Sequence, residues 1–115
     1  MANIGGKTKA TIQTNTAAKN AIGEAVKSWT DAFSLFGWLD LQSGDSKYTN
    51  QNAKVEESTH IFLCDYHPGA YALAGQDCRL IVKGFVYDVL FIDNPMELNE
   101  QLEIYLRRVG AWDGK

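Results

Sequence analysis

The stretch that decides the fold reads Arg79-Leu-Ile-Val-Lys-Gly-Phe-Val-Tyr-Asp-Val-Leu-Phe-Ile-Asp-Asn-Pro95, and it leads into Gln101-Leu-Glu-Ile-Tyr-Leu-Arg107. We predict three strands from it. Lys83-Gly84 is the tight turn between the first two, because glycine reaches a positive φ at little steric cost. Asp93-Asn94-Pro95 ends the second strand, since proline cannot donate to a central ladder. The block therefore predicts a mostly β protein.

Alternation of apolar and polar residues predicts further strands over residues 9–14, 24–30, 32–41 and 58–65, with a connector at 15–23. In 32–41 the apolar residues fall on both phases, which is typical of a strand covered on both faces. One phase holds Phe33, Leu35, Leu39 and Leu41, and the other holds Phe36 and Trp38.

The last strand of the block is one-sided. Its apolar residues Leu102, Ile104 and Leu106 are expected to face inward. Its other phase is expected to face outward and holds Glu103, Tyr105 and Arg107. This pattern predicts an edge strand or one with a solvated face.

Residues 42–55 are polar, and a stretch of this length inside a small domain predicts a functional or disordered loop. A short surface helix near 44–55, capped by Ser43 or Asp45, is the alternative. About six or seven short strands, interrupted by this one long polar loop, predict a small antiparallel β-barrel or sandwich with at most a short helix. We expect a flexible N-terminal arm at 1–8, one domain at 9–109 and a tail at 110–115.

Composition excludes several classes of protein. A chain of 115 residues buries roughly 65% of its unfolded surface, so it needs neither a metal nor a disulfide for stability. The net charge of −3 argues against nucleic-acid binding driven by bulk charge. The sequence has no apolar run of membrane-spanning length and no signal-peptide core, so we expect a protein made in a cytoplasm, without membrane contact. Cys64 and Cys78 are then expected to stay reduced.

The strongest enzyme-like constellation is Cys64, His67 and Cys78, whose Cys-x-x-His spacing could chelate zinc. Structural zinc sites normally have paired short spacings at both ends, and Cys78 stands alone. We therefore interpret both cysteines as small core residues and His67, before Pro68, as a loop or packing residue. The sequence has no nucleophile elbow and no phosphate-binding loop, so we expect no catalysis, metal or cofactor.

The aromatic residues of the sequence indicate association with other protein subunits. Aromatic residues are favoured at interface centres. Phe36, Trp38, Tyr105 and Trp112 occupy positions that a small barrel is not expected to bury. For Phe36 and Trp38, an ordinary two-sided core strand is the competing interpretation. The exposed Trp and Tyr residues also leave open a barrel module that binds single-stranded nucleic acid by stacking.

The order of parts resembles the head-closure (stopper, or head–tail joining) proteins of long-tailed bacteriophages over residues 9–109. The most specific fragment is Gly84-Phe-Val-Tyr-Asp88. The other matching fragments, in order, are Ala10-Thr-Ile-Gln13, Gly23 with Trp29-Thr-Asp31, Trp38 to Ser43-Gly44, Ser58-Thr-His-Ile-Phe62, His67-Pro-Gly69, Asn94-Pro95 and Asn99 to Ile104. The 70–78 loop is longer than is usual for that family.

The resemblance implies a non-enzymatic virion protein that is assembled in the host cytoplasm. Such proteins form a ring below the portal and its adaptor, and they offer a platform to the tail-completion or tail-tube protein. By position, the channel or gating loop that contacts the packaged double-stranded DNA, without sequence specificity, comprises Ser43, Gly44, Asp45, Ser46, Lys47, Tyr48, Asn50 and Gln51. The expected subunit or partner interface comprises Phe36, Trp38, Tyr105, Arg107 and Trp112. A tail-completion protein, one ring lower, is the closest alternative.

Overall fold

The computed structural model describes residues 8–16, 18–19, 22–23, 25–26, 28–41 and 58–114. Its elements, in chain order, are β1 (Thr8–Asn15), β2 (Ala18–Lys19), β3 (Ala25–Val26), β4 (Trp29–Leu41), β5 (His60–Asp65), α2 (Pro68–Tyr71), β6 (Cys78–Val82), β7 (Phe85–Asp93), the 3₁₀ turn η1 (Pro95–Glu97) and β8 (Gln101–Ala111).

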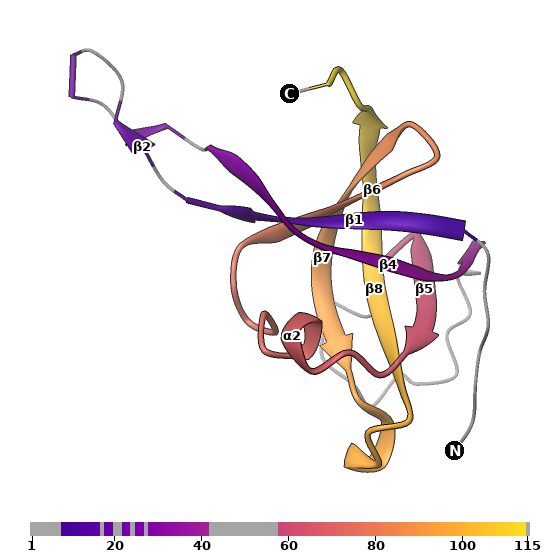
Figure 1. Ribbon diagram of the computed structural model, residues 1–115. Coiled ribbons are helices and arrows are strands. Elements are labelled where there is room, and N and C mark those ends of the chain that lie inside the picture. The colour runs from indigo at the N-terminus through magenta and orange to yellow at the C-terminus, as the bar shows by residue number, and fades with distance from the viewer. Residues whose placement is uncertain are drawn as a thin grey trace.

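Six of these strands close into an antiparallel barrel in the order β1-β4-β5-β8-β7-β6 (Figure 1). This confirms the predicted mostly β class and, of the two architectures, the barrel. The predicted turn at Lys83-Gly84 joins β6 to β7, and both residues have positive φ, +51° and +80°. That conformation matches the right-handed twist of the flanking strands. The block that opened the sequence analysis therefore forms the β6–β7–β8 wall.

The core fills the inside of the barrel. Phe62 of β5 and Tyr87 of β7 are completely buried, as are the predicted inward residues Leu102, Ile104 and Leu106 of β8. Leu41 shares a phase with the buried Leu35 and was expected to be covered, but it is 77% exposed. It pairs with His60, the first residue of β5, so it lies where this side of the barrel ends.

Tyr105 differs from its predicted orientation toward solvent, because it is only 2% exposed. Cross-strand neighbours explain this burial. Tyr105 lies between Ile61 of β5 and Phe91 of β7, with ring centroids 5.9 Å apart in the Phe91 pair. Its hydroxyl donates to the Glu103 carboxylate at 3.2 Å. The prediction from β8 alone was wrong because two adjacent strands supply its cover.

A one-turn helix, α2, lies in the stretch predicted to be a loop. His67 caps it, since its Nδ1 accepts the Ala70 N–H at 3.0 Å, and Pro68 begins it with a preset φ. The helix considered near 44–55 lies outside the described residues. In the part of the chain that the structure describes, no helix is long and apolar enough to cross a membrane.

The segment predicted as a connector and a separate strand forms a hairpin instead. β1 and β4 pair as far as Asn15 and Trp29, beyond the Ala10–Thr14 stretch where β6 covers β1. β2 and β3 then pair with each other, and Ile22 and Gly23 lie between them. We call β2, β3 and Ile22–Gly23 the projecting hairpin, because it extends away from the barrel (Figure 1).

Gly37 is the point at which β4 changes partner. It pairs with Thr8 of β1 on one side and with Cys64 of β5 on the other. A Cβ atom at Gly37 would lie 1.9 Å from the Leu63 carbonyl oxygen. Glycine is therefore required for β4 to approach β5 this closely at the corner of the barrel.

Candidate functional site

The outside of the barrel carries an apolar strip made of residues from three strands. We call it the outer apolar wall, and it consists of Phe36 and Trp38 on β4, Ile61 and Leu63 on β5, and Phe91 on β7. Trp38 pairs with Leu63, and Ile61 and Phe91 flank the buried Tyr105. Within a sheet such cross-strand neighbours pack together. The strip is therefore one continuous surface rather than a set of scattered side chains.

Phe36 and Trp38 are 56% and 48% exposed. These exposures rule out the competing interpretation of a two-sided core strand. The two aromatic rings stand on the solvent side of a strand whose other phase, with Leu35 at 3%, is buried. Their role in an interface remains a prediction, and their position on a continuous apolar surface fits it.

Two further interface positions predicted from the sequence lie elsewhere. Arg107 reaches Asp88 of β7 at 3.2 Å, but both side chains are nearly half exposed, so the pair adds little stability. Trp112 is 41% exposed, and its backbone N–H donates to the Gly84 carbonyl at 2.9 Å. The structure therefore does not gather the five predicted positions into one site, and Tyr105 is the buried member among them.

Near the C-terminal end of β8, Arg108 contacts residues of β7 and Thr59. The predicted interface residue in this part of the strand is its neighbour, Arg107. The Arg108 guanidinium lies 4.1 Å from the Phe85 ring centroid and donates to the Tyr87 hydroxyl at 2.9 Å. Its backbone N–H donates to the Thr59 hydroxyl. The signal that could have found it is the arginine-after-arginine pattern on a strand, which sends one side chain to each side.

His60 completes this cluster. Its ring packs edge-on against Tyr87 with centroids 5.1 Å apart, and its Nδ1 lies 2.9 Å from the Thr59 hydroxyl oxygen. Burial and then the nearby Arg108 lower the pKa of His60, because both disfavour the charged imidazolium. The cluster stands beside Leu41 and Ser58, the described residues that flank the predicted channel loop.

The predicted channel-loop residues Ser43, Gly44, Asp45, Ser46, Lys47, Tyr48, Asn50 and Gln51 lie outside the described residues. So do residues 1–7 of the expected N-terminal arm. The structure nevertheless places β5, the strand that follows the loop. β5 starts opposite Leu106 of β8 and ends opposite Gln101. The loop therefore rejoins the barrel at one end of β5 and β8, and the β7–β8 turn closes the other end.

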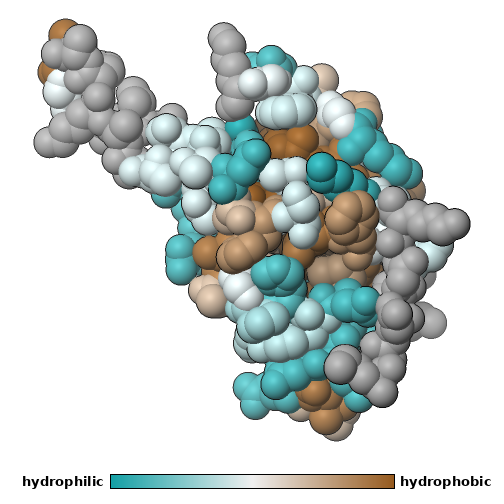
Figure 2. Space-filling view, viewed as in Figure 1, coloured by the Kyte–Doolittle hydropathy of each residue, from teal (hydrophilic) through white to brown (hydrophobic). Residues whose placement is uncertain are grey.

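The β7–β8 turn is an apolar tip that the sequence analysis missed. Met96 is 87% and Leu98 is 58% exposed, and Figure 2 shows an apolar area at this lower end of the molecule. Met96, Glu97 and Asn99 all have φ between +53° and +57°, a costly region for residues with a Cβ. The buried Asn94 side chain holds the turn by bonding the backbone N–H and side chain of Asn99.

Polar contacts fix the base of the projecting hairpin to the barrel. The buried Gln13 accepts from Arg79 Nε at 2.8 Å and donates to Asp31 at 2.7 Å. Arg79 also lies 4.4 Å from the ring centroid of Trp29, the first residue of β4. Asn15 bonds Asp77 through both backbone and side chain. These contacts therefore hold the ends of β1 and β4, from which the hairpin continues, against the barrel.

The two cysteines are core residues. Burial raises the pKa of Cys64 to about 12 and that of Cys78 to about 11, with nearby carboxylates as the smaller cause. Both thiols are protonated at neutral pH and are poor nucleophiles. His67 is committed to capping α2 and packs on Phe33 at 4.7 Å. Among the described residues, no group of three His, Cys, Asp or Glu side chains is placed to hold a metal ion.

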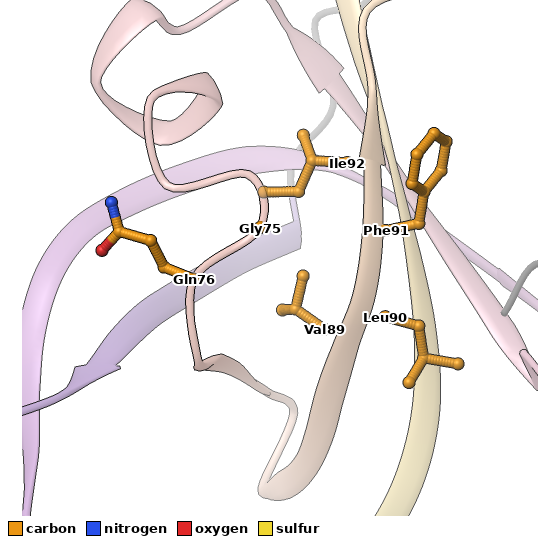
Figure 3. A pocket seen from close by; sticks show the side chains of 6 residues that line it. All are labelled: Gly75, Gln76, Val89, Leu90, Phe91 and Ile92. Carbon is orange, nitrogen blue, oxygen red and sulfur yellow. The ribbon is translucent and has the colours of Figure 1, made fainter.

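A small recess of about 60 Å³ lies between the loop after α2 and the middle of β7. It is lined by Gly75, Gln76, Val89, Leu90, Phe91 and Ile92 (Figure 3). Val89 and Ile92 point toward the Gly75 loop, and Leu90 and Phe91 point to the other side of the strand. The accessible lining of this recess is mostly polar, with Val89 and Ile92 as the apolar side chains that point toward the loop.

Comparison with known proteins defines the family. The fold is similar to the solution structure of protein SF1141 from Shigella flexneri 2a, with a TM-score of 0.62, 19% sequence identity and 95% coverage of both chains. At this identity the likeness shows the fold alone. No curated protein matches the sequence. A family model described as the phage head completion protein matches residues 5–109, in agreement with the resemblance found in the sequence. The chain therefore belongs to the phage head completion protein family.

Proposed function

We propose that this protein forms a ring below the portal and adaptor proteins of a phage head, where it closes the DNA-filled head and provides the platform for the tail. The observation that carries the proposal is its membership of the phage head completion family over residues 5–109. That membership indicates a structural role in the phage head–tail region of the virion. A non-catalytic role agrees with the buried, protonated thiols of Cys64 and Cys78.

A protein held between two neighbouring rings needs two distinct faces, and the ends of β5 and β8 differ in that way. At one end the chain leaves at Leu41 and returns at Ser58, beside Arg108. At the other end the β7–β8 turn presents Met96 and Leu98. In this proposal the first end faces the channel, and the apolar tip contacts a neighbouring ring.

The channel element is the loop that holds Ser43–Gln51. Its polar composition suits contact with a DNA backbone, and the acidic charge of the whole protein keeps its affinity for DNA low enough for passage. We assign it the retention of double-stranded DNA without sequence specificity. Phe36 and Trp38 on the outer apolar wall, with Arg107 and Trp112, are the proposed contacts to neighbouring subunits, the adaptor or the tail protein.

The test is to assemble phage particles with and without this protein and to measure DNA retention and tail joining separately. The proposal expects heads without the protein to lose packaged DNA and to remain tailless, and the wild-type gene to restore both. Heads that keep their DNA but lack tails would place the protein one ring lower, as a tail-completion protein. Heads that keep their DNA and join tails normally would refute the proposal.

A loop variant separates the two roles. Replacing residues 43–51 by a Gly-Ser segment of equal length keeps the length of the connection between β4 and β5 and removes its side chains. We expect such particles to join tails but to leak DNA. The matched control replaces Met96 and Leu98 by serine, which changes the opposite end of the barrel and is expected to impair ring docking instead.

A further inference from the structure

We propose that Arg108 and His60 form a phosphate-binding site at one end of the barrel, and that its ligand is the sugar–phosphate backbone of the packaged DNA. This inference rests on the proposed function, because it names the groups that meet the DNA beside the channel loop. It assigns to the barrel itself a contact that the proposed function gives to the loop alone.

Arg108 and His60 continue the inner face of the barrel to its rim. His60 pairs with Leu106 of β8. Arg108 pairs with Tyr87 of β7. Paired residues in a sheet have their side chains on the same face, and both Leu106 and Tyr87 are completely buried in the core. The core face therefore ends in two side chains that can donate hydrogen bonds, an exposed Arg108 and a half-buried His60.

The Arg108 guanidinium is held in place but retains donors for a ligand. It lies 4.1 Å from the ring centroid of Phe85, and it donates to the Tyr87 hydroxyl at 2.9 Å. A guanidinium has five N–H groups, and the others find no acceptor among the described residues. No described carboxylate pairs with Arg108, whereas the neighbouring Arg107 pairs with Asp88. A positioned guanidinium of this kind suits the oxygens of a phosphate.

His60 adds a second donor, from β5. Its Nδ1 lies 2.9 Å from the Thr59 hydroxyl oxygen, which also accepts the Arg108 backbone N–H and lies 3.5 Å from the Leu106 carbonyl oxygen. The hydroxyl can donate to a neutral His60 ring, or accept from a charged ring while it donates to the carbonyl. In both of these states Nε2 carries a hydrogen and is a donor. The site therefore serves an anion whether or not His60 is charged.

The two donors flank one tyrosine, at the end of the barrel from which the proposed channel loop departs. The His60 ring packs 5.1 Å from the Tyr87 ring, and Arg108 bonds the hydroxyl of the same residue. The charge of Arg108 reaches His60, because it contributes to the lowered pKa of that ring. Leu41, the last described residue before the loop, pairs with His60. This placement favours DNA as the source of the phosphate.

A contact of this kind agrees with an acidic protein, of net charge −3, that lets DNA pass. One arginine neutralises one phosphate, so binding by a single subunit is weak and depends on salt. A phosphate contact reads no base, so it carries no sequence specificity. In the proposed ring every subunit offers the same contact, and the contacts act together. Retention then depends on the number of subunits rather than on the affinity of one.

Titration of the purified protein, followed by NMR at low salt, tests the site. Two probes are added separately, inorganic phosphate and a short DNA duplex of mixed sequence. We expect the signals of the Arg108 guanidinium and the His60 ring to move with both probes. The pKa of His60 should rise when phosphate is bound, because the anion offsets the charge of Arg108. Signals that move elsewhere while these two stay unchanged would overturn the proposal.

Arg108→Gln and Arg107→Gln are a matched pair of variants. They remove the same charge from adjacent positions of β8, but from opposite faces of the strand. We expect Arg108→Gln to weaken the binding of both probes about tenfold, and Arg107→Gln to weaken it by less than about twofold. Equal weakening would assign the binding to bulk charge and overturn the proposal.

Two further outcomes are decisive. Binding of inorganic phosphate without binding of the duplex would overturn the proposal, because the assigned ligand is the DNA backbone. The wild-type titration needs no variant, so it decides the question even if Arg108→Gln is unstable.

These measurements separate the site from the proposed function. If both probes bind as expected, but particles without the protein retain DNA and join tails, the site stands and the proposed function is wrong. If particles need the protein to retain DNA, but neither probe moves the signals of Arg108 and His60, the site is wrong and the function stands.

Discussion

β8 and β4 are the two long strands of the barrel, with 11 and 13 residues, and they differ in how they use their two phases. Leu102, Ile104 and Leu106 of β8 are completely buried in the core. β4 buries Leu35 on one phase and exposes Phe36 and Trp38 on the other. The difference teaches that a strand with two apolar phases can fill the core with one phase and leave the other on the surface of the barrel.

The largest expected difference in the free energy of unfolding is between a substitution in the core and one in the outer apolar wall. Phe62→Ala removes a completely buried ring and should lower the free energy of unfolding by about 4 kcal/mol. Phe36→Ala removes an exposed ring and should cost less than about 1 kcal/mol. Urea denaturation of the purified protein measures both. Similar losses in the two variants would mean that β4 is covered on both faces after all.

The second prediction concerns the corner of β4. Gly37→Ala places a methyl group against the Leu63 carbonyl oxygen and should destabilise the protein by about 3 kcal/mol. Gly110→Ala in β8 is the matched control, because a Cβ there meets nothing within 4 Å, and it should change stability by less than about 0.5 kcal/mol. Thermal and urea unfolding report both changes. A tolerated Gly37→Ala would show that β4 and β5 do not approach so closely.

The third prediction tests how β1 and β4 continue into the projecting hairpin. Gln13→Leu removes bonds to Arg79 and Asp31 and should cost about 2 kcal/mol. Amide exchange of Thr16, whose N–H bonds the Ser28 carbonyl, should accelerate in this variant. Thr11→Leu, also on β1, is the control that leaves these bonds intact. Unchanged protection at Thr16 in Gln13→Leu would show that the hairpin is held independently of the barrel.

The last prediction concerns the two buried cysteines, whose effect on stability is absent at neutral pH and emerges only at alkaline pH. Burial raises the pKa of Cys64 to about 12 and of Cys78 to about 11, so the folded protein holds these thiol protons more tightly than the unfolded chain. Their contribution to stability is complete below about pH 9 and is lost as the pH rises toward 11–12, by roughly 1.4 kcal/mol per pH unit for each thiol. Denaturation at several alkaline pH values measures it. A Cys64→Ala, Cys78→Ala double variant should lose this slope, and an unchanged slope would assign it to other groups.

Sequence patterns predicted the β6–β7–β8 wall because its determinants are local. A Lys-Gly turn, an Asn-Pro break and a strict alternation in β8 each act within a few residues. The pattern failed at Tyr105 because its cover comes from Ile61 and Phe91, which are remote in sequence. It also failed at the hairpin, whose residues are small or polar and whose base is bonded to the distant Asp77 through Asn15.

The candidate site was only partly predictable. Phe36 and Trp38 were found because aromatic residues on the second phase of β4 conflict with a single core. Met96 and Leu98 were missed because they lie in a turn in which Met96, Glu97 and Asn99 adopt left-handed backbone, which composition does not reveal in residues with a Cβ. The recess beside β7 was missed because it exists where pairing with β6 stops, a fact of register rather than of local sequence.

The continuity of β4 has a structural consequence. This single strand begins at Trp29, beside the projecting hairpin, and ends at Leu41, where the chain enters the proposed channel loop. Its 13 residues span about 40 Å and are hydrogen-bonded first to β1 and then to β5. One continuous hydrogen-bonded strand therefore links the base of the projecting hairpin to the residue that precedes the proposed channel loop, and Gly37 marks the point at which that strand changes partner.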